Sequence, residues 1–364
     1  MVDDASPEWN LELEYRPFSL ELETPLETAD GTIEHREGFL VKLTDVAGDD
    51  GSDTVGYGEA APLPGWTESP ADCEAALARA KEAARDGPNE ALEAVEEQVA
   101  ARHAVALALA DLGATREATP LYRYVGKGPM IGRVPVNATI GDGSPGETAG
   151  AATDAVDRGF QCCKLKAGRR TVAADVERVR RVRDAVGDDV ELRVDANEAW
   201  TYEEAMRAIE EFAALDVAVL EQPLPAGALE GHADLREAAA DTPVSIALDE
   251  GVLEHGVDAI CETRAADALV LKPMALGGID VARKVAAWVQ ELDLTPIVTT
   301  TIDGVVARTG AVHLAASIPD VPACGLATGE FLAEDLGTDP VLMEKGAAVV
   351  PQTKGLGVEG VWEA

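Results

Sequence analysis

Residues 217–223 read VAVLEQP, residues 244–250 read VSIALDE and residues 268–273 read ALVLKP. In each stretch a short apolar run ends in an ionisable side chain. Short apolar runs between polar segments are typical of strands in a buried parallel sheet. Charged groups are rarely buried unless they are paired or bind a metal. Core packing does not explain this repetition, which therefore indicates a functional site at a row of strand ends.

The same unit of strand, polar loop and amphipathic helix repeats on both sides of these stretches, every 25–30 residues or so. We predict strands at Val134–Ile140, Gln161–Lys166, Glu191–Asp195, Val217–Glu221, Val244–Asp249, Ala268–Lys272, Pro296–Thr301 and Ala323–Leu326, with helices between them such as Thr171–Val186, Tyr202–Leu215, Ile279–Leu292 and Gly304–Ser317. Eight such units predict an α/β fold built on a parallel (β/α) barrel.

The first 125 residues have a different pattern. Alternating residues predict strands at Leu11–Tyr15, Phe18–Leu22 and Phe39–Leu43, with a turn at Ala29–Gly31. Residues 56–70, rich in Gly and Pro, predict a mobile loop, and residues 71–112 predict helices. We therefore expect an α+β domain over residues 1–125, joined by the C-terminal segment 340–364, and a barrel domain over residues 126–339.

The 364 residues carry 67 Asp and Glu against 30 Lys and Arg, for a formal net charge of −37. Nucleic acids and anionic membrane surfaces would repel such a chain. No apolar run reaches the roughly 18–20 residues that span a bilayer, and the start lacks the pattern of a signal peptide. We expect a cytoplasmic protein with no nucleic-acid or membrane partner.

The acidic residues are spread along the whole chain. Their repulsion destabilises the compact state unless salt screens it. We therefore hypothesise a halophilic protein that works in a salty cytosol. An unfolding temperature that does not rise between low and molar KCl would contradict this hypothesis.

Three acidic residues, Asp195, Glu221 and Asp249, end three successive predicted strands. Because the carboxyl ends of the strands meet at one face of a barrel, we expect these carboxylates to converge. Three carboxylates without His or Cys suit a hard divalent cation, Mg²⁺ above all.

Lysines flank the three carboxylates: Lys164 and Lys166 on one side and Lys272 on the other. Lys164 and Lys166 are two residues apart on a strand, so their side chains share a face. Two close ammonium groups near a metal disfavour each other's protonation, and a lysine with a lowered pKa is a general base. Lysines on both sides of a substrate carboxylate that is bound to the metal indicate a reaction in which the enzyme removes a proton from the carbon next to that carboxylate.

The motifs KLK (164–166), DAN (195–197), EQP (221–223), LDE (248–250) and LKP with Gly277-Gly278 resemble, in this order, the muconate-lactonising subgroup of the enolase superfamily. The resemblance covers nearly the whole chain. It implies an enolase-type barrel closed by the N-terminal capping domain. It also implies Mg²⁺, with Mn²⁺ as a substitute, a small carboxylate substrate and, in many members, a homo-oligomer.

By the same resemblance, Lys166 is the base, Lys164 its modulating neighbour and Lys272 the lysine of the opposite face. Asp195, Glu221 and Asp249 are the metal ligands, and the side chains of Asn197 and Glu250 orient ligands and lysines. The stretch from Thr299 to Gly304 resembles the Ser/Thr-rich segment of o-succinylbenzoate synthases. The residues expected to receive the substrate's carboxylate there, on hydroxyls and a helix N-terminus, are Thr300, Thr301, Asp303 and Gly304.

Several reactions are open within the subgroup. Dipeptide epimerases usually carry Asp-x-Asp in the loop after the eighth strand, whereas this region of the chain reads CGLATGE (324–330), without that motif. We therefore expect an o-succinylbenzoate synthase, a lyase that dehydrates a cyclohexadiene carboxylate through an enediolate in menaquinone biosynthesis. The alternatives are an N-acylamino acid racemase or dipeptide epimerase, or a muconate cycloisomerase, with the same lysines. A non-catalytic binding barrel is disfavoured because it needs no such lysine pair.

Overall fold

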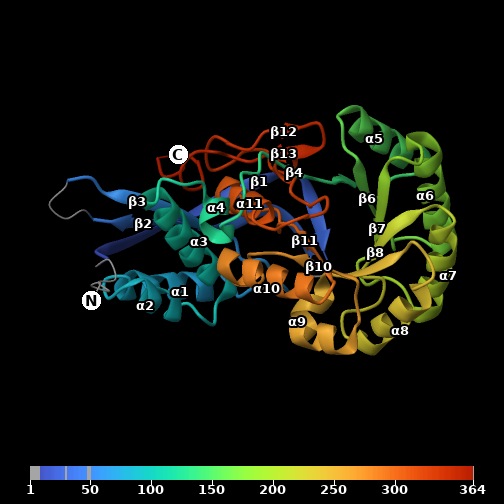
Figure 1. Cartoon of the computed structure of the whole chain (residues 1–364), viewed down its shortest axis with the longest axis horizontal. Coiled ribbons are helices and arrows are strands. Elements are labelled where there is room, and N and C mark those ends of the chain that lie inside the picture. Colours follow the sequence, from blue (N-terminus) through green and yellow to red (C-terminus); the bar gives the residue numbers. More distant parts are fainter. Residues whose placement is uncertain (1–8, 29–30, 47–50, 364) are drawn as a thin grey trace.

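The computed structural model describes residues 9–28, 31–46 and 51–363. Figure 1 shows two parts, an N-terminal sheet with its helices and a ring of parallel strands surrounded by helices. This is the enolase-type arrangement of a capping domain and a barrel-like domain that the sequence predicts, and the related structures described below share it. Within the described residues, no helix is both long and apolar enough to cross a bilayer.

The capping sheet is antiparallel, with three strands in the order β1 (Leu11–Thr28), β2 (Gly31–Asp45) and β3 (Thr54–Ala60). The sequence predicts two strands up to Leu22, but the structure has a single strand that pairs with β2 almost throughout. Alternation buries Leu11 and Leu13 on one face of β1, while Leu20 and Leu22 point to the opposite face and pack in the other core cluster. Of the predicted turn, Ala29 and Asp30 lie outside the described residues, and Gly31 begins β2.

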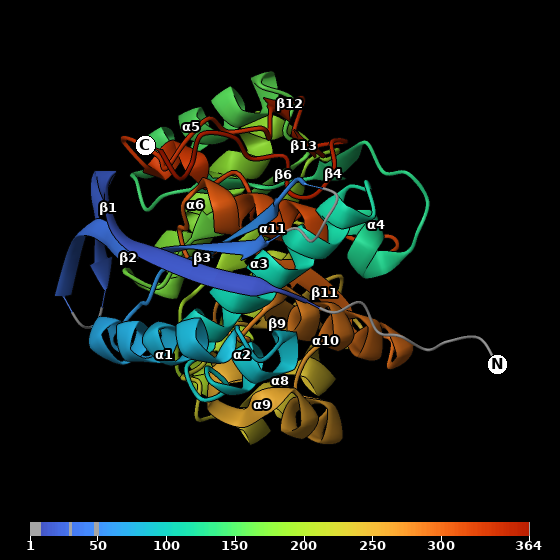
Figure 2. The ribbon, with the colours of Figure 1, turned by 90° about the vertical axis from the view of Figure 1, so that its left-hand side faces the viewer.

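The predicted loop at residues 56–70 is partly wrong, because residues 56–60 belong to β3. Glycine at 58 lets this strand approach helix α3, since a Cβ there would lie 1.9 Å from the Ala104 carbonyl oxygen. In Figure 2 the sheet crosses in front of α3. The helices of this part are α1 (Pro70–Ala83), α2 (Pro88–Glu93), α3 (Val99–Arg116) and α4 (Leu121–Gly126).

Seven parallel strands form the barrel sheet in the order β11, β10, β9, β8, β7, β6, β5. Their bounds are β5 (Ala138–Ile140), β6 (Cys162–Lys166), β7 (Glu191–Asp195), β8 (Val217–Glu221), β9 (Ser245–Leu248), β10 (Ala268–Leu271) and β11 (Thr295–Val298). Two bridges close the ring, from Cys324 to Val136 and from Gly325 to Thr299.

Two predicted strands differ from this arrangement. Of Val134–Ile140, only β5 joins the barrel, while β4 (Arg133–Pro135) pairs with β13 (Ala347–Val349) in a separate sheet. The predicted strand Ala323–Leu326 is reduced to the two bridging residues. Both segments lie at the point where the barrel closes.

Helices connect the barrel strands: α5 (Pro145–Asp157), α6 (Val172–Val186), α7 (Tyr202–Ala213), α8 (Leu229–Ala239), α9 (Glu250–Thr263), α10 (Ile279–Glu291) and α11 (Val305–Ala316). Local sequence explains where several of them begin. Ser144 with Glu147 and Thr201 with Glu204 form capping boxes that satisfy the first free amides of α5 and α7.

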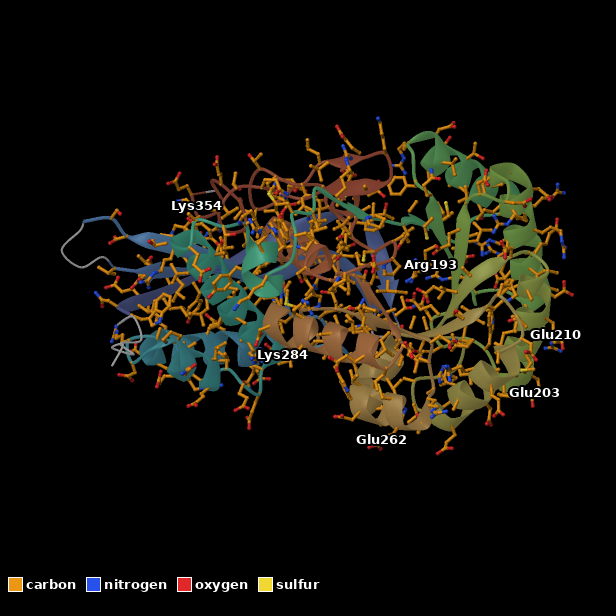
Figure 3. All side chains as sticks on the ribbon, viewed as in Figure 1. Arg193, Glu203, Glu210, Glu262, Lys284 and Lys354 are labelled. Carbon is orange, nitrogen blue, oxygen red and sulfur yellow. The ribbon has the colours of Figure 1, made fainter. Side chains whose placement is uncertain are left out.

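Side chains from neighbouring strands pack together inside the barrel. Val219, Ala247, Ala268 and Ile297 come from four neighbouring strands and form a small apolar cluster. Arg193, 3% exposed, donates to the Ala323 carbonyl, and Figure 3 shows it among the strands. By contrast, Glu203 and Glu210 lie on the outer edge of α7 in the same view. Because side chains two apart share a strand face, the functional residues continue this inward row at the carboxyl ends.

The C-terminal segment contacts both parts of the molecule. Strand β13 pairs with β4 and with β12 (Met343–Glu344), while the Val361 carbonyl accepts a hydrogen bond from Arg16 on β1. The ring of Trp362 faces the cations of Arg16 and Lys42. We therefore propose that residues 340–364 complete the capping domain and join it to the start of the barrel domain.

A buried ion pair holds the carboxyl ends of β5 and β6. Arg178 donates to Asp175 (2.8 Å) and to the carbonyls of Lys166 (2.9 Å) and Gly141 (3.1 Å), and its side chain is 1% exposed. We expect Arg178→Met to lower the free energy of unfolding by about 3–5 kcal/mol, because it leaves the buried Asp175 carboxylate without its ionic partner. Urea unfolding measures this loss. The exposed Arg181→Met is the control, and an equal effect of both variants would contradict the assignment.

Candidate active site

Three carboxylates and an amine meet where β6, β7 and β8 end. The Lys164 ammonium lies 2.9 Å from Asp195 Oδ2 and 2.6 Å from Glu221 Oε1. Asp195 and Glu221 are register partners on neighbouring strands. Asp249, which follows β9, is close enough to raise the pKa of both Lys164 and Glu221 by its charge. The predicted convergence of these side chains is therefore present in the structure.

The other two predicted site lysines join the same cluster from opposite sides. The Lys166 ammonium donates to Asp195 Oδ2 (2.7 Å) and to Asn197 Oδ1 (2.8 Å). The Asn197 amide in turn donates to Glu250 Oε1 (3.1 Å). Across the site, the Lys272 ammonium donates to Asp249 Oδ2 (2.7 Å). Amines from β6 and from the end of β10 thus flank a common acidic centre.

The donor set fits a hard divalent cation. Within the described residues, no three acidic, His or Cys side chains are already closed around one point as metal ligands. The amines explain this, because Lys164 lies between two of the carboxylates and Lys272 is bound to the third. Asp249 Oδ1 fits a cation ligand, because it is buried and has no hydrogen-bond partner among the described residues. An unpaired buried carboxylate oxygen is costly unless a cation balances it.

The ionisation of the cluster follows from burial and pairing. Burial raises the pKa of Glu221 to about 7, helped by the charges of Asp195 and Asp249. Burial alone would raise the pKa of Asp195 as well, but the ammonium groups of Lys164 and Lys166 hold it below its ordinary value. For Lys164, burial favours the neutral amine, yet the three carboxylates raise its pKa above the ordinary value. The lowered lysine pKa expected from the sequence refers to the site with its metal bound, and it stays a prediction.

The contacts of residues 299–304, which follow β11, differ from those expected for a substrate site. The hydroxyl of Thr300 bonds that of Thr328 (2.8 Å), and the hydroxyl of Thr301 donates to Asp303. The Gly304 amide donates to Glu59 Oε1 (2.6 Å), a carboxylate of the capping domain. The N-terminus of α11 is therefore already bound by a buried acid, which corrects the expectation that it receives the substrate's carboxylate.

Glu59 and Arg36 connect the capping sheet to this segment. Glu59 is fully buried and accepts from the amides of Gly304 and of Ala307 (2.9 Å). Arg36, 2% exposed, donates to the carbonyls of Ala61 (2.7 Å) and Ile302 (3.1 Å). Neither residue could be predicted from the sequence, because nothing in the pattern of β2 or β3 shows that these side chains face another domain.

Burial and the nearby charge of Asp303 raise the pKa of Glu59 from 4.5 to about 8. The folded state therefore binds the proton of Glu59 more tightly than the unfolded chain does, and protonation of Glu59 stabilises the fold. This stabilisation is fully present below pH 4.5 and is lost as the pH rises through about 8. We expect the free energy of unfolding to fall between pH 5 and 8, and Glu59→Gln to make this fall shallower. Denaturant titrations at several pH values measure it, with the exposed Glu210→Gln as control; an unchanged slope would contradict this prediction.

Two further residues of the site were missed. Gln222 Oε1 accepts from the amides of Asp249 and Gly251, both at 3.0 Å, and so fixes the end of β9 beside Glu221. Its place directly after Glu221 in the EQP motif is a usable signal. Trp66, in the segment between β3 and α1, lies over Lys272 with 3.3 Å between the ammonium and the ring centroid. A lone aromatic in a Gly/Pro-rich segment is a weak signal.

Comparison with known proteins identifies a matching family and several related enzymes. Residues 147–364 match the family described as "Enolase C-terminal domain-like". The L-Ala-D/L-Glu epimerase of Bacillus subtilis is 30% identical over 363 residues, covering 96% of each chain. Its substrate-liganded structure superposes with a TM-score of 0.85 at 29% identity, over 97% of this chain and 99% of that one.

Two other relatives bear on the chemistry. An o-succinylbenzoate synthase of Thermobifida fusca is 34% identical over 227 residues, which is 61% of this chain and 68% of the relative. A dipeptide epimerase of Enterococcus faecalis, in complex with Mg and the dipeptide L-Leu-L-Tyr, is 26% identical with a TM-score of 0.82. That match covers 96% of this chain and 99% of the other.

Proposed function

The chain belongs to the Enolase C-terminal domain-like family, within the enolase superfamily, and from this premise we propose that it is a Mg²⁺-dependent racemase or epimerase. Its substrate is an amino-acid derivative with a free carboxylate, either a dipeptide or an N-acyl amino acid. The reaction inverts the carbon next to that carboxylate. The epimerase relative covers more of this chain than the synthase relative does, which supports an enzyme of the isomerase type over a lyase.

The observation that carries this proposal is the pair of amines on opposite sides of the acidic centre. Lys166 reaches Asp195 from β6, and Lys272 reaches Asp249 from the end of β10. Inversion needs one group that removes a proton from one face of a carbon and another that returns a proton to the other face. Two lysines placed in this way supply both groups.

Asp195, Glu221 and Asp249 are the residues that would hold Mg²⁺, which when bound supplies positive charge to the substrate's carboxylate and to the enediolate formed from it. Lys166 removes the proton on its side, and Lys272 returns a proton from the other side; the reverse reaction exchanges these roles. Asn197, bonded to both Lys166 and Glu250, holds the first lysine in place. Lys164 neutralises two of the carboxylates when no cation is bound.

This proposal reverses the order of the two activities expected from the sequence. The relative with the fuller coverage is an epimerase, whereas the similarity to an o-succinylbenzoate synthase covers less of the chain. One observation keeps the synthase as the second candidate. Residues 324–330, which begin with the bridging residues Cys324 and Gly325, carry no Asp-x-Asp motif that could bind the ammonium group of a dipeptide. Among the epimerase substrates, this favours an N-acyl amino acid, which has no such group.

Proton NMR in D₂O with Mg²⁺ and molar KCl tests the proposal. The protein is incubated separately with L-Ala-L-Glu, with a set of N-succinyl amino acids and with the cyclohexadiene carboxylate of the synthase reaction. We expect the α-proton signal of one of the first two substrates to disappear, while chiral chromatography shows that its stereoisomer accumulates. Formation of o-succinylbenzoate without any α-proton exchange would replace the racemase by the second candidate.

A further inference from the structure

Trp66 belongs to the capping domain but contacts the barrel's catalytic centre. Its ring centroid lies 3.3 Å from the Lys272 ammonium, whose other near partner is Asp249 Oδ2 at 2.7 Å. The ammonium is therefore held between a carboxylate and an aromatic face. A cation at this distance from an indole is strongly attracted by the ring, more so when it is desolvated, and the Lys272 side chain is only 12% exposed.

The segment that carries Trp66 is tied down on both sides of the ring. Before it, Arg36 bonds the carbonyls of Ala61 and Pro62. At Trp66, the backbone amide donates to the Leu63 carbonyl (3.0 Å). After it, Glu68 accepts from two amides at the start of α3, at 3.0 and 2.9 Å. These hydrogen bonds hold the segment in the conformation that places the indole against Lys272.

We propose that Trp66 is a positioning residue for Lys272, an inference that rests on the proposed racemase or epimerase function. The indole face keeps the Lys272 amine on the side of the substrate opposite to Lys166. Among the described residues, the only other partner of the Lys272 ammonium is Asp249, whose carboxylate would also bind the cation. When Asp249 binds the cation, the indole remains as the contact that stops the amine from swinging away from the substrate.

The contact itself is tested without any substrate. Indole N–H signals of the full chain are recorded by NMR, and that of Trp66 is identified by its loss in Trp66→Phe among the five tryptophans. We expect this signal to move in Lys272→Met and to stay in place in Lys284→Met, a change at an exposed lysine on α10. A Trp66 signal that is the same in both lysine variants would overturn the proposal.

The role of the contact is tested with the Mg²⁺-loaded enzyme in D₂O, by comparing inversion with deuterium exchange that retains configuration. For the enantiomer deprotonated by Lys166, we expect Trp66→Leu to slow inversion by about tenfold, the scale of a desolvated cation–π contact, while exchange with retention persists. For the other enantiomer, both processes slow together. Trp66→Phe, which keeps an aromatic face, restores part of the loss.

A merely structural role of Trp66 would slow inversion and exchange equally for both enantiomers, and this result would overturn the proposal. An unmodified enzyme that exchanges no α-proton would instead refute the proposed function. In that case the NMR comparison still decides whether Trp66 holds Lys272, because that measurement needs no turnover.

Discussion

Lys166→Ala is expected to abolish inversion, with a loss of about 10²–10⁴-fold in kcat, the contribution of a positioned general base. Lys166 is the amine that bonds Asp195 and Asn197 at the end of β6. In the part of the chain that the structure describes, no other lysine takes this position, since the Lys164 ammonium is bound by Asp195 and Glu221. Turnover is measured by polarimetry or by a chiral assay of the product.

The same variant is expected to bind Mg²⁺ about as well as the unmodified protein, because all three carboxylates remain. Calorimetric titration with Mg²⁺ measures this. The control is Lys284→Ala, which removes an exposed amine on α10 and should change neither property. Full turnover by the Lys166 variant would remove this residue from the mechanism, and loss of Mg²⁺ binding would show that it supports the metal site instead.

Glu221→Gln is expected to weaken Mg²⁺ binding by at least about 100-fold and to abolish turnover with it, since even partners of metal ligands contribute 10–100-fold. The amide keeps the shape of the side chain but removes one of three negative charges. The side chain of Glu221 is 3% exposed and lies against Lys164, which retains Asp195 as a partner in the variant. The fold should therefore persist.

Calorimetry with Mg²⁺ again provides the measurement, and Glu203→Gln on the outer edge of α7 is the matched control. If Glu221→Gln binds Mg²⁺ with unchanged affinity, the three carboxylates do not hold the cation and the oxygen site must be assigned elsewhere.

Much of the barrel and the centre of the site could be predicted from the sequence because both depend on local patterns. A short apolar run followed by Asp, Glu or Lys identifies a strand and its carboxyl end together, as at Glu221 and Asp249. Since parallel strands in a barrel share one functional face, their order along the chain already brings these side chains together. Residues such as Asp195 and Glu221 then follow as register partners.

Contacts between the two domains could not be predicted in this way. Nothing near residue 304 in the sequence shows that Glu59, some 245 residues earlier, binds the Gly304 amide. The expected carboxylate site at this helix N-terminus was therefore wrong. Trp66 was missed for the same reason, because its partner Lys272 lies in the other domain. The predicted strand Val134–Ile140 is two strands in the structure, because its two halves pair in different sheets.

The proposed inversion depends on two amines that act on opposite faces of one carbon. Its most direct test is deuterium incorporation at the α-carbon of each separate enantiomer by Lys166→Ala and by Lys272→Ala, with Mg²⁺ bound. We predict that neither variant inverts its substrate, and that each still exchanges the proton of one enantiomer, a different one in the two variants. Exchange of the same enantiomer by both variants would contradict the placement of these lysines on opposite faces.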